Sequence, residues 1–177
     1  MSMAASPELT DHAAGPADEF VDELFRAHSV SLVRLAMLLV GDQQSAEDVV
    51  QDAFLRLYRG LAGLRDRDKA LPYLRTSVVN GARSALRARR RALLRRVAHQ
   101  PAVWSAESAA LDGEDRRAVL AAVARLPRRS REVLVLRYYL DLPDHEIAET
   151  LGVSRGTVSS TASRAMAALT RELEEER

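Results

Sequence analysis

The sequence predicts an all-α protein made of two small helical domains joined by a flexible linker. Ala, Leu, Arg and Val dominate the composition and aromatic residues make up only 5% of it, a balance that favours helices over a sheet-rich fold. Apolar residues recur at helical spacing on both sides of residues 97–113, a stretch with proline and glycine but no periodicity. The 177 residues suffice for one ordinary domain or two small ones, and the interrupted pattern favours two.

The composition also excludes several classes of protein. The chain has no cysteine, so it forms no disulfide bond and no thiolate metal site. Residues 1–17 lack the basic and apolar regions of a signal peptide, and their Ala, Ser, Pro, Gly and Asp content predicts a disordered tail. The longest apolar run, residues 35–40, is too short to span a bilayer. We therefore expect a soluble, cytoplasmic protein without membrane insertion.

The charge is distributed unevenly along the chain, although the formal net charge is only +1. Residues 1–52 contain just two cations, Arg26 and Arg34, whereas residues 83–96 contain seven arginines and no acid. A chain of this kind can bind nucleic acid with one face and another partner with a second face. The near-neutral total predicts weak DNA binding by the protein alone.

The first two helices are predicted from apolar spacing and from their ends. One begins at Asp18 and ends at Gly41, a residue suited to a left-handed C-cap. The next begins near Ser45, whose hydroxyl can accept an unpaired N–H, and ends near Leu61. The face of this helix opposite its apolar side is charged. From the pattern alone, a charged face of this kind is more often simply exposed to solvent than bound to a partner.

A third helix follows a predicted loop over residues 63–70, with Pro72 in its first turn. One stripe of this helix carries polar residues at spacings of three or four: Thr76, Asn80, Arg83, Arg87 and Arg90. Arginine suits bidentate phosphate contacts and asparagine can read a base edge. The alternative is a solubilising basic face, but the absence of any acid from Arg75 to Arg96 favours nucleic-acid binding.

The second domain follows the predicted linker, whose Trp104 is the only tryptophan and suggests a docking contact. Its first helix ends at Pro127 and its second near Asp141. Residues 146–165 then predict a helix-turn-helix. Three residues define its turn: Gly152 suits the left-handed position, Val153 fills the angle between the helices, and Ser154 can cap the second helix.

In a helix-turn-helix, the start of the second helix meets the base edges of the major groove. Six polar residues are candidates for that contact: Arg155, Thr157, Ser159, Ser160, Ser163 and Arg164. The alternative is a corner between two helices with no DNA role, but the match at every structural position favours the DNA-binding motif.

The sequence carries little that points to catalysis. His145-Glu146 resembles the start of a metalloprotease H-E-x-x-H helix, but Glu149 stands where the second histidine is required. The other histidines are scattered, and neither a Ser/His/Asp arrangement nor a glycine-rich phosphate loop occurs. We expect no catalytic residue, no metal, no cofactor and no enzymatic activity.

Four segments of the chain stand in a distinctive order and separation: residues 46–58, the helix over 73–91, Leu126-Pro127 with residues 131–133, and residues 146–158. In this order and separation the chain resembles group 4, or extracytoplasmic-function (ECF), RNA polymerase sigma factors of the sigma-70 family. The resemblance covers residues 18–173. It implies a protein that binds core RNA polymerase, recognises promoter −10 and −35 elements, and assists promoter melting.

The resemblance also implies roles for individual segments. Residues 18–96 would form sigma region 2 and residues 114–177 sigma region 4, with the linker threading towards the RNA exit channel. The expected contacts with the β′ clamp helices are Glu47, Asp48, Gln51, Asp52, Leu55 and Arg56. The expected −10 contacts are Arg65, Arg67, Lys69, Thr76, Asn80, Arg83, Arg87 and Arg90, and the helix-turn-helix residues would read the −35 element. The implied partners are core polymerase, including its β flap, promoter DNA and an anti-sigma factor.

Two departures from the family pattern affect these expectations. Ser159, Ser160 and Thr161 stand where the recognition helix is often richer in Arg or Lys, so we expect fewer −35 contacts. Pro143 stands where a capping residue is frequent, and it offers no capping oxygen.

The competing hypothesis is a free-standing helix-turn-helix repressor or activator that binds duplex DNA as a dimer, but no leftover amphipathic helix is available for dimerisation.

Overall fold

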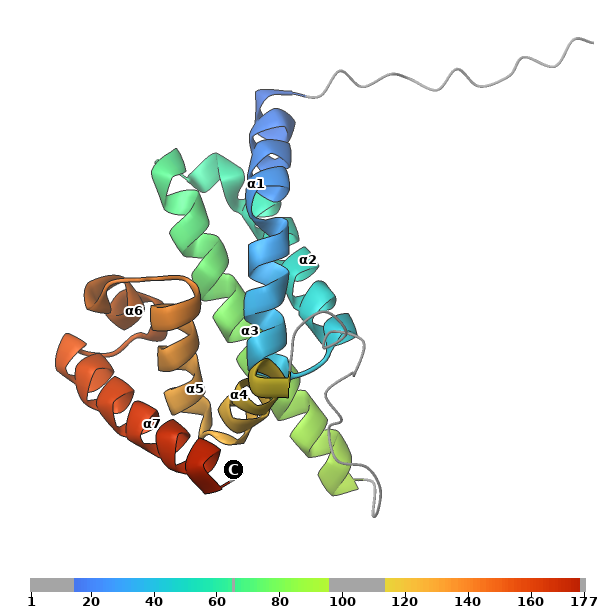
Figure 1. Ribbon diagram of the computed structural model, residues 1–177. Coiled ribbons are helices and arrows are strands. Elements are labelled where there is room, and N and C mark those ends of the chain that lie inside the picture. Colours follow the sequence, from blue (N-terminus) through green and yellow to red (C-terminus); the bar gives the residue numbers. More distant parts are fainter. Residues whose placement is uncertain (1–14, 65, 96–113, 176–177) are drawn as a thin grey trace, which may run out of the picture.

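A computed structural model describes residues 15–64, 66–95 and 114–175. These residues form helices and short connections and contain no strand, so the all-α prediction is confirmed for the described part of the chain (Figure 1). The predicted linker with Trp104, most of the predicted tail and Arg65 lie outside the described residues.

Three long helices form the N-terminal domain: α1 (Pro16–Val40), α2 (Gln43–Gly60) and α3 (Ala70–Arg95). Their apolar faces meet in a core that includes Leu35, Val50 and Leu74, each of them almost completely buried. Burial of these side chains is the main source of stability for helices whose propensity alone is modest.

The ends of α1 are set by local capping. The helix begins two residues before the predicted Asp18, so the prediction of a disordered tail was wrong for its last two residues. Pro16 suits the first turn, and the Asp18 carboxylate accepts a hydrogen bond from the Gly15 N–H at 2.9 Å. Hydrogen bonding to the Tyr58 side chain and to the Gly15 backbone also lowers the pKa of Asp18. The predicted end is confirmed, since Gly41 adopts a left-handed φ of 87°.

The start of α2 corrects a second prediction. Asp42, not Ser45, is the N-cap, and its carboxylate accepts a hydrogen bond from the Ser45 N–H at 2.8 Å. An aspartate in the capping position also places negative charge at the positive end of the helix dipole. The segment predicted as a loop after α2 contains two 3-10 turns, Leu61–Gly63 and Arg67–Lys69.

Four helices form the C-terminal domain: α4 (Glu114–Arg125), α5 (Arg128–Leu134), α6 (Asp144–Leu151) and α7 (Arg155–Glu175). Pro127 separates α4 from α5, as predicted. After α5 the chain makes a π-helical turn, Val135–Tyr139, that the periodicity did not predict. Leu136, Ile147 and Val158 are fully buried and hold these helices together.

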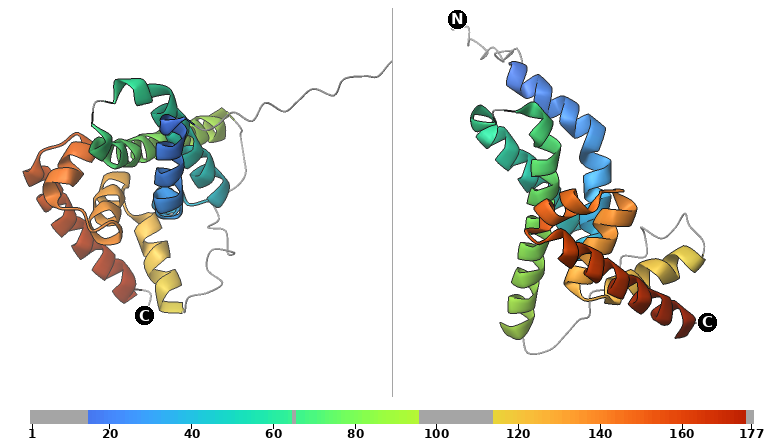
Figure 2. Two further views of the ribbon diagram at one scale, coloured as in Figure 1. Left: turned by 90° about the horizontal axis from the view of Figure 1, so that it is seen from above. Right: turned by 90° about the vertical axis from the view of Figure 1, so that its left-hand side faces the viewer.

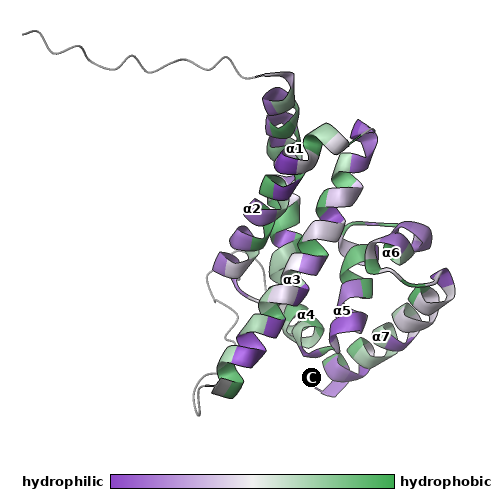
Figure 3. Cartoon of the chain, turned by 180° about the vertical axis from the view of Figure 1, so that it is seen from behind, coloured by the Kyte–Doolittle hydropathy of each residue, from purple (hydrophilic) through white to green (hydrophobic). Residues whose placement is uncertain are grey.

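The two domains pack against each other, an arrangement that a flexible linker alone does not predict. α6 lies against α3, while α4, α5 and the π-helical turn lie against α1 (Figures 1 and 2). The C-terminal part of α3 extends beyond this shared body (Figure 2). Coloured by hydropathy, that extension alternates between hydrophilic and hydrophobic residues (Figure 3).

Candidate nucleic-acid and partner interfaces

One exposed face of α2 carries the six residues predicted to bind polymerase. All six are exposed: Glu47, Asp48, Gln51, Asp52, Leu55 and Arg56. Leu55 and the nearby Tyr58 are 44% and 51% exposed, so two large side chains lie open among the charges. Apolar and aromatic groups within a polar rim are typical of a protein-binding surface. The prediction omitted Tyr58, although an aromatic residue three positions after Leu55 indicates the same face.

The opposite side of α2 is fixed by packing. Phe54 is buried and meets Phe25 of α1 edge to face, with ring centroids 5.1 Å apart. A groove of about 510 Å³ runs between α2 and α3, and its walls include Asp48 and Asp52 on one helix and Ser84 on the other. The polar face is therefore presented by a helix that the core holds in place.

The predicted −10 residues occupy two parts of the N-terminal domain. Along α3, Asn80, Arg87 and Arg90 are exposed, whereas Thr76 and Arg83 are half-buried. Arg87 donates a hydrogen bond to the Ser84 hydroxyl at 3.0 Å. In the turn before α3, Arg67 and Lys69 are exposed, and the Arg67 guanidinium lies 4.6 Å above the centre of the Phe20 ring.

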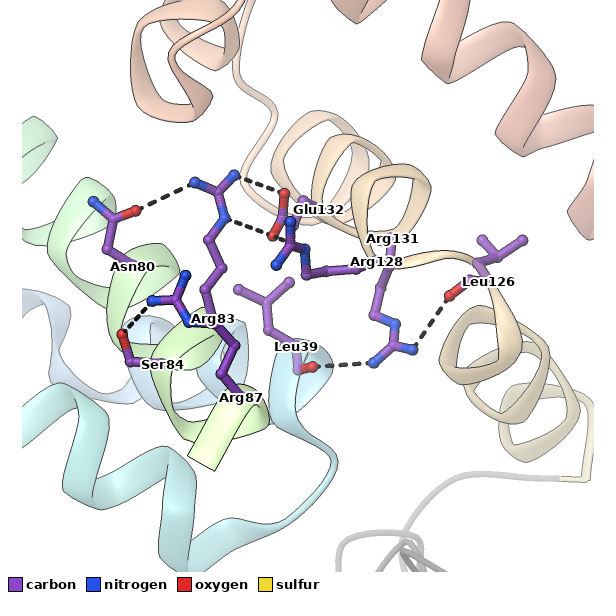
Figure 4. Close-up of polar contacts among 9 residues, drawn as sticks. All are labelled: Leu39, Asn80, Arg83, Ser84, Arg87, Leu126, Arg128, Arg131 and Glu132. Atoms are coloured by element: carbon purple, nitrogen blue, oxygen red, sulfur yellow. Dashed lines mark hydrogen bonds and ion pairs between the residues drawn. The ribbon is translucent and has the colours of Figure 1, made fainter. Parts of the chain in front are cut away.

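Arg83 is paired with a carboxylate of the other domain (Figure 4). Its Nε and one terminal nitrogen donate to the two Glu132 oxygens, both at 2.8 Å, and the side chains are 16% and 3% exposed. These hydrogen bonds raise the pKa of the Arg83 guanidinium, so the side chain stays positively charged. Arg83 also donates to the Asn80 side-chain oxygen at 3.3 Å, which links the cation to the candidate base reader.

Further polar contacts join the domains around this pair. Arg75 of α3 lies 3.1 Å from the Glu146 carboxylate of α6. Arg131 of α5 donates to the Leu39 carbonyl at the end of α1, at 3.0 Å (Figure 4), and its burial lowers the pKa of its guanidinium. Sequence reasoning missed Glu132, although a lone acid directly before the apolar run of residues 133–136 is a signal for a buried, paired carboxylate.

The turn between α6 and α7 has the predicted geometry. Gly152 adopts a left-handed φ of 66°, and the Ser154 hydroxyl accepts a hydrogen bond from the Thr157 N–H at 3.2 Å. The candidate base-reading residues all lie exposed on α7: Arg155, Thr157, Ser159, Ser160, Ser163 and Arg164. Val158, Thr161 and Ala162 of the same helix are buried, so burial orients the polar face outward.

Among the described residues, no cluster of three or more His, Asp or Glu side chains could hold a metal ion. None of the described helices combines the length and the apolar character needed to cross a membrane.

Comparisons with known proteins match both halves of the chain to one family. Residues 24–92 match the family model of sigma-70 region 2, and residues 116–169 match that of sigma-70, region 4. The RNA polymerase sigma-E factor of Streptomyces avermitilis is 35% identical over 162 residues, which cover 92% of this chain and 89% of that protein. The ECF RNA polymerase sigma factor SigM of Mycobacterium tuberculosis is 36% identical over 166 residues, covering 92% and 81%.

One relative is much longer than this chain. A Xanthomonas campestris protein named as a probable RNA polymerase sigma factor, RfaY, is 33% identical over 170 residues, and these cover 92% of this chain but 42% of that protein. Among solved structures, the sigma factor RpoE of Bartonella quintana, in complex with the anti-sigma factor NepR, has a TM-score of 0.70 at 24% identity, over 90% of this chain and 99% of that one. That likeness supports the helical fold.

Proposed function

Because the chain belongs to the sigma-70 family of RNA polymerase sigma factors, in its ECF group, we propose that it binds core RNA polymerase and directs promoter-specific initiation. One observation carries the proposal: both sigma-70 regions occur in a single chain, and each presents an exposed polar face on a helix held by its own core. Residues 18–96 act as region 2 and residues 114–177 as region 4.

The face of α2 binds the polymerase, through the clamp helices of its β′ subunit. The exposed Leu55 and Tyr58 supply apolar area at the centre of the contact, and Asp48 and Asp52 supply charge around it. The β flap is the expected contact of the C-terminal domain. Charge pairs of this kind set the orientation of the two proteins as well as their affinity.

The N-terminal domain recognises and melts the −10 element. Asn80 reads a base, while Arg87, Arg90 and the cations before α3 bind phosphates. Melting proceeds by capture of a base flipped out of the non-template strand, so this domain favours single-stranded −10 DNA over duplex. The exposure of Asn80, Arg87 and Arg90 along one side of α3 supports this assignment.

The C-terminal domain recognises the −35 element through α7. Arg155 at the start of the helix meets a base edge or an adjacent phosphate, and Thr157 and the serines supply hydroxyl groups. Arg155 and Arg164 are the two cations of residues 155–166, so few phosphates are neutralised and the −35 contact contributes modestly to affinity.

The protein acts as a non-catalytic subunit in the cytoplasm, where the polymerase works. An anti-sigma factor is the expected regulatory partner, and the structurally similar sigma factor RpoE of Bartonella quintana was solved in complex with the anti-sigma factor NepR.

Co-elution with core RNA polymerase distinguishes this function from that of a free-standing repressor. A sigma factor forms a stable complex with core enzyme in size-exclusion chromatography and binds asymmetric promoter DNA as one copy. A dimeric repressor elutes apart from core enzyme and binds symmetric duplex sites. Elution of the purified protein apart from core at micromolar concentration would overturn the proposal.

A further inference from the structure

The beginning of α7 presents one outward line of residues. The buried residues of this helix define its inner side: Val158, Thr161, Ala162, Ala165 and Leu169. Successive residues of an α-helix are rotated by about 100°, so Gly156, Ser160 and Ser163 lie within about 40° of the direction opposite this inner side. We call these three residues the crest of α7. In a helix-turn-helix bound to DNA, the crest of the second helix faces the base edges, and here Arg155 and Arg164 lie to its two sides.

The hydrogen bonding of Ser160 gives its hydroxyl a defined polarity. Ser160 and Ser163 are both exposed, and they are the side chains of the crest because Gly156 has none. The Ser160 hydroxyl donates to the Thr157 carbonyl oxygen at 3.3 Å. A hydroxyl has a single hydrogen, so this group can only accept a further hydrogen bond. Ser163 forms no side-chain hydrogen bond within the part of the chain that the structure describes, so its hydroxyl can donate or accept.

Two neighbouring side chains are directed elsewhere by contacts within the motif. The Arg164 Nε donates to the Ser160 carbonyl oxygen at 3.2 Å, which lays the guanidinium along the helix beside the crest. The Thr157 Oγ1 atom lies 2.8 Å from the Ser154 hydroxyl oxygen, so the threonine hydroxyl is directed towards the helix cap. Among the hydroxyl groups near the start of α7, that of Ser160 is therefore the one with both a central position and a fixed polarity.

The polarity of this hydroxyl selects between the bases. In the major groove adenine presents its 6-amino group and cytosine its 4-amino group, and both are donors, whereas the corresponding groups of guanine and thymine are acceptors. An oxygen that can only accept pairs with an amino group and leaves two acceptors facing each other at guanine or thymine. We propose that Ser160 is a specificity-determining residue of the −35 contact and reads the amino group of an adenine or a cytosine. The proposal rests on the sigma-factor function, whose −35 site it refines.

Ser160→Ala tests the proposal, since it removes the acceptor from an exposed position and spares the core. The probe is a promoter duplex that reconstituted holoenzyme protects from nuclease at −35, with each base pair of that element changed in turn. Wild-type holoenzyme should bind about fivefold more weakly when one adenine or cytosine is replaced, as expected for the loss of one uncharged hydrogen bond. Holoenzyme with Ser160→Ala should bind the original promoter more weakly by the same factor and show no preference at that base pair.

Replacement of single atoms in the DNA separates this hydrogen bond from a structural effect. Purine in place of adenine, or 2-pyrimidinone in place of cytosine, lacks only the amino group. Each should weaken binding of wild-type holoenzyme about fivefold at one position and have no effect on holoenzyme with Ser160→Ala. The position at which the effect occurs identifies the base as adenine or cytosine. Ser160→Thr keeps the hydroxyl and should restore the discrimination.

Thr170→Ala is the matched control. The Thr170 hydroxyl also donates to a carbonyl of its own helix, that of Met166 at 3.1 Å, and is also exposed. Thr170 lies about 15 Å beyond Ser160 along α7, past the part of the helix that meets the bases. Its substitution should change neither the affinity for the promoter nor the preference at any base pair.

The possible failures are distinguishable. If Ser160→Ala weakens binding equally on every −35 sequence, or has no effect on binding, Ser160 does not read a base and the inference is wrong. A preference for guanine or thymine that disappears with Ser160→Ala would show the opposite polarity and would also overturn it. If holoenzyme with the wild-type protein neither transcribes nor protects any −35 sequence, the sigma-factor function itself has failed.

Discussion

Gly81 of α3 faces Val49 of α2 so closely that a Cβ atom at position 81 would lie 2.9 Å from the Val49 Cγ1 atom. The two helices can approach at this point only because residue 81 has no side chain. Their approach fixes the groove between the polymerase-binding face of α2 and the nucleic-acid face of α3. The glycine thus controls the relative position of two predicted binding surfaces.

We expect Gly81→Ala to lower the free energy of unfolding by about 1 kcal/mol. Overpacking against a β-branched side chain costs about 1–3 kcal/mol, and the better helix propensity of alanine returns up to about 1 kcal/mol. Urea denaturation measures the difference. Gly60→Ala, at a position with open space around the new methyl group, is the matched control and should be neutral or stabilising. A Gly81→Ala protein at least as stable as wild type would show that the Val49 side chain moves aside without lowering the free energy of unfolding.

The double substitution of Asp48 and Asp52 by alanine should weaken binding to core polymerase and spare folding. Both carboxylates are exposed, so the fold does not depend on them, whereas charge contacts that become buried in the complex are worth about 1–3 kcal/mol. A fluorescence titration with core enzyme measures the loss. Alanine at Glu174 and Glu175, which removes the same charge from the end of α7, should bind core like wild type. Equal affinity of all three proteins would count against α2 as the polymerase-binding helix.

Asn80→Ala and Arg87→Ala should separate base reading from phosphate binding. The asparagine can hydrogen-bond to one base, so its loss should relax the −10 preference, while loss of the arginine should weaken open-complex formation on every promoter and reduce its salt dependence. Permanganate footprinting of holoenzyme on −10 variants, at several salt concentrations, checks both. If holoenzymes with either variant melt every promoter as wild-type holoenzyme does, this side of α3 is only a solvent-exposed face.

Arg155→Ala and Arg164→Ala should differ in the same way on the −35 element. Arg155 begins α7, where side chains reach base edges, and its loss should cost about 1–3 kcal/mol and relax one base position if it reads a guanine. Arg164 lies more than two turns further along and should contribute uniformly across sequences. Holoenzyme binding to a panel of −35 variants is the measurement. Equal losses on every sequence would assign base reading to Thr157 and the serines instead.

Much of the fold could be predicted because the signals that specify it are local. The spacing of apolar residues predicted the helices. Gly41 and Gly152 predicted the left-handed backbone conformation at two helix C-termini, and Ser154 predicted the N-cap of the recognition helix. Two errors also arose locally. The N-cap of α2 was assigned to Ser45 although the nearby Asp42 can cap the same helix end, and the π-helical turn was missed because its sequence looks like that of an ordinary α-helix.

The packing of the two domains could not be predicted in this way. Arg83 and Glu132 are 49 positions apart, and no periodicity relates residues in different domains. The sequence could place Arg83 on the nucleic-acid stripe of α3, but only the tertiary structure shows that a carboxylate already binds it. The roles of the individual polymerase and DNA contacts remain predictions, because each is defined by a partner molecule.

Run-off transcription with core polymerase on a genomic promoter library tests the central claim most directly. Core enzyme alone should give only non-specific transcripts. Adding the wild-type protein should produce discrete transcripts from a small set of promoters that share −10 and −35 sequences, and adding the Asp48→Ala/Asp52→Ala protein should produce far fewer. Transcript patterns identical with and without the wild-type protein, at concentrations that saturate core enzyme, would contradict the assignment of this chain as a sigma factor.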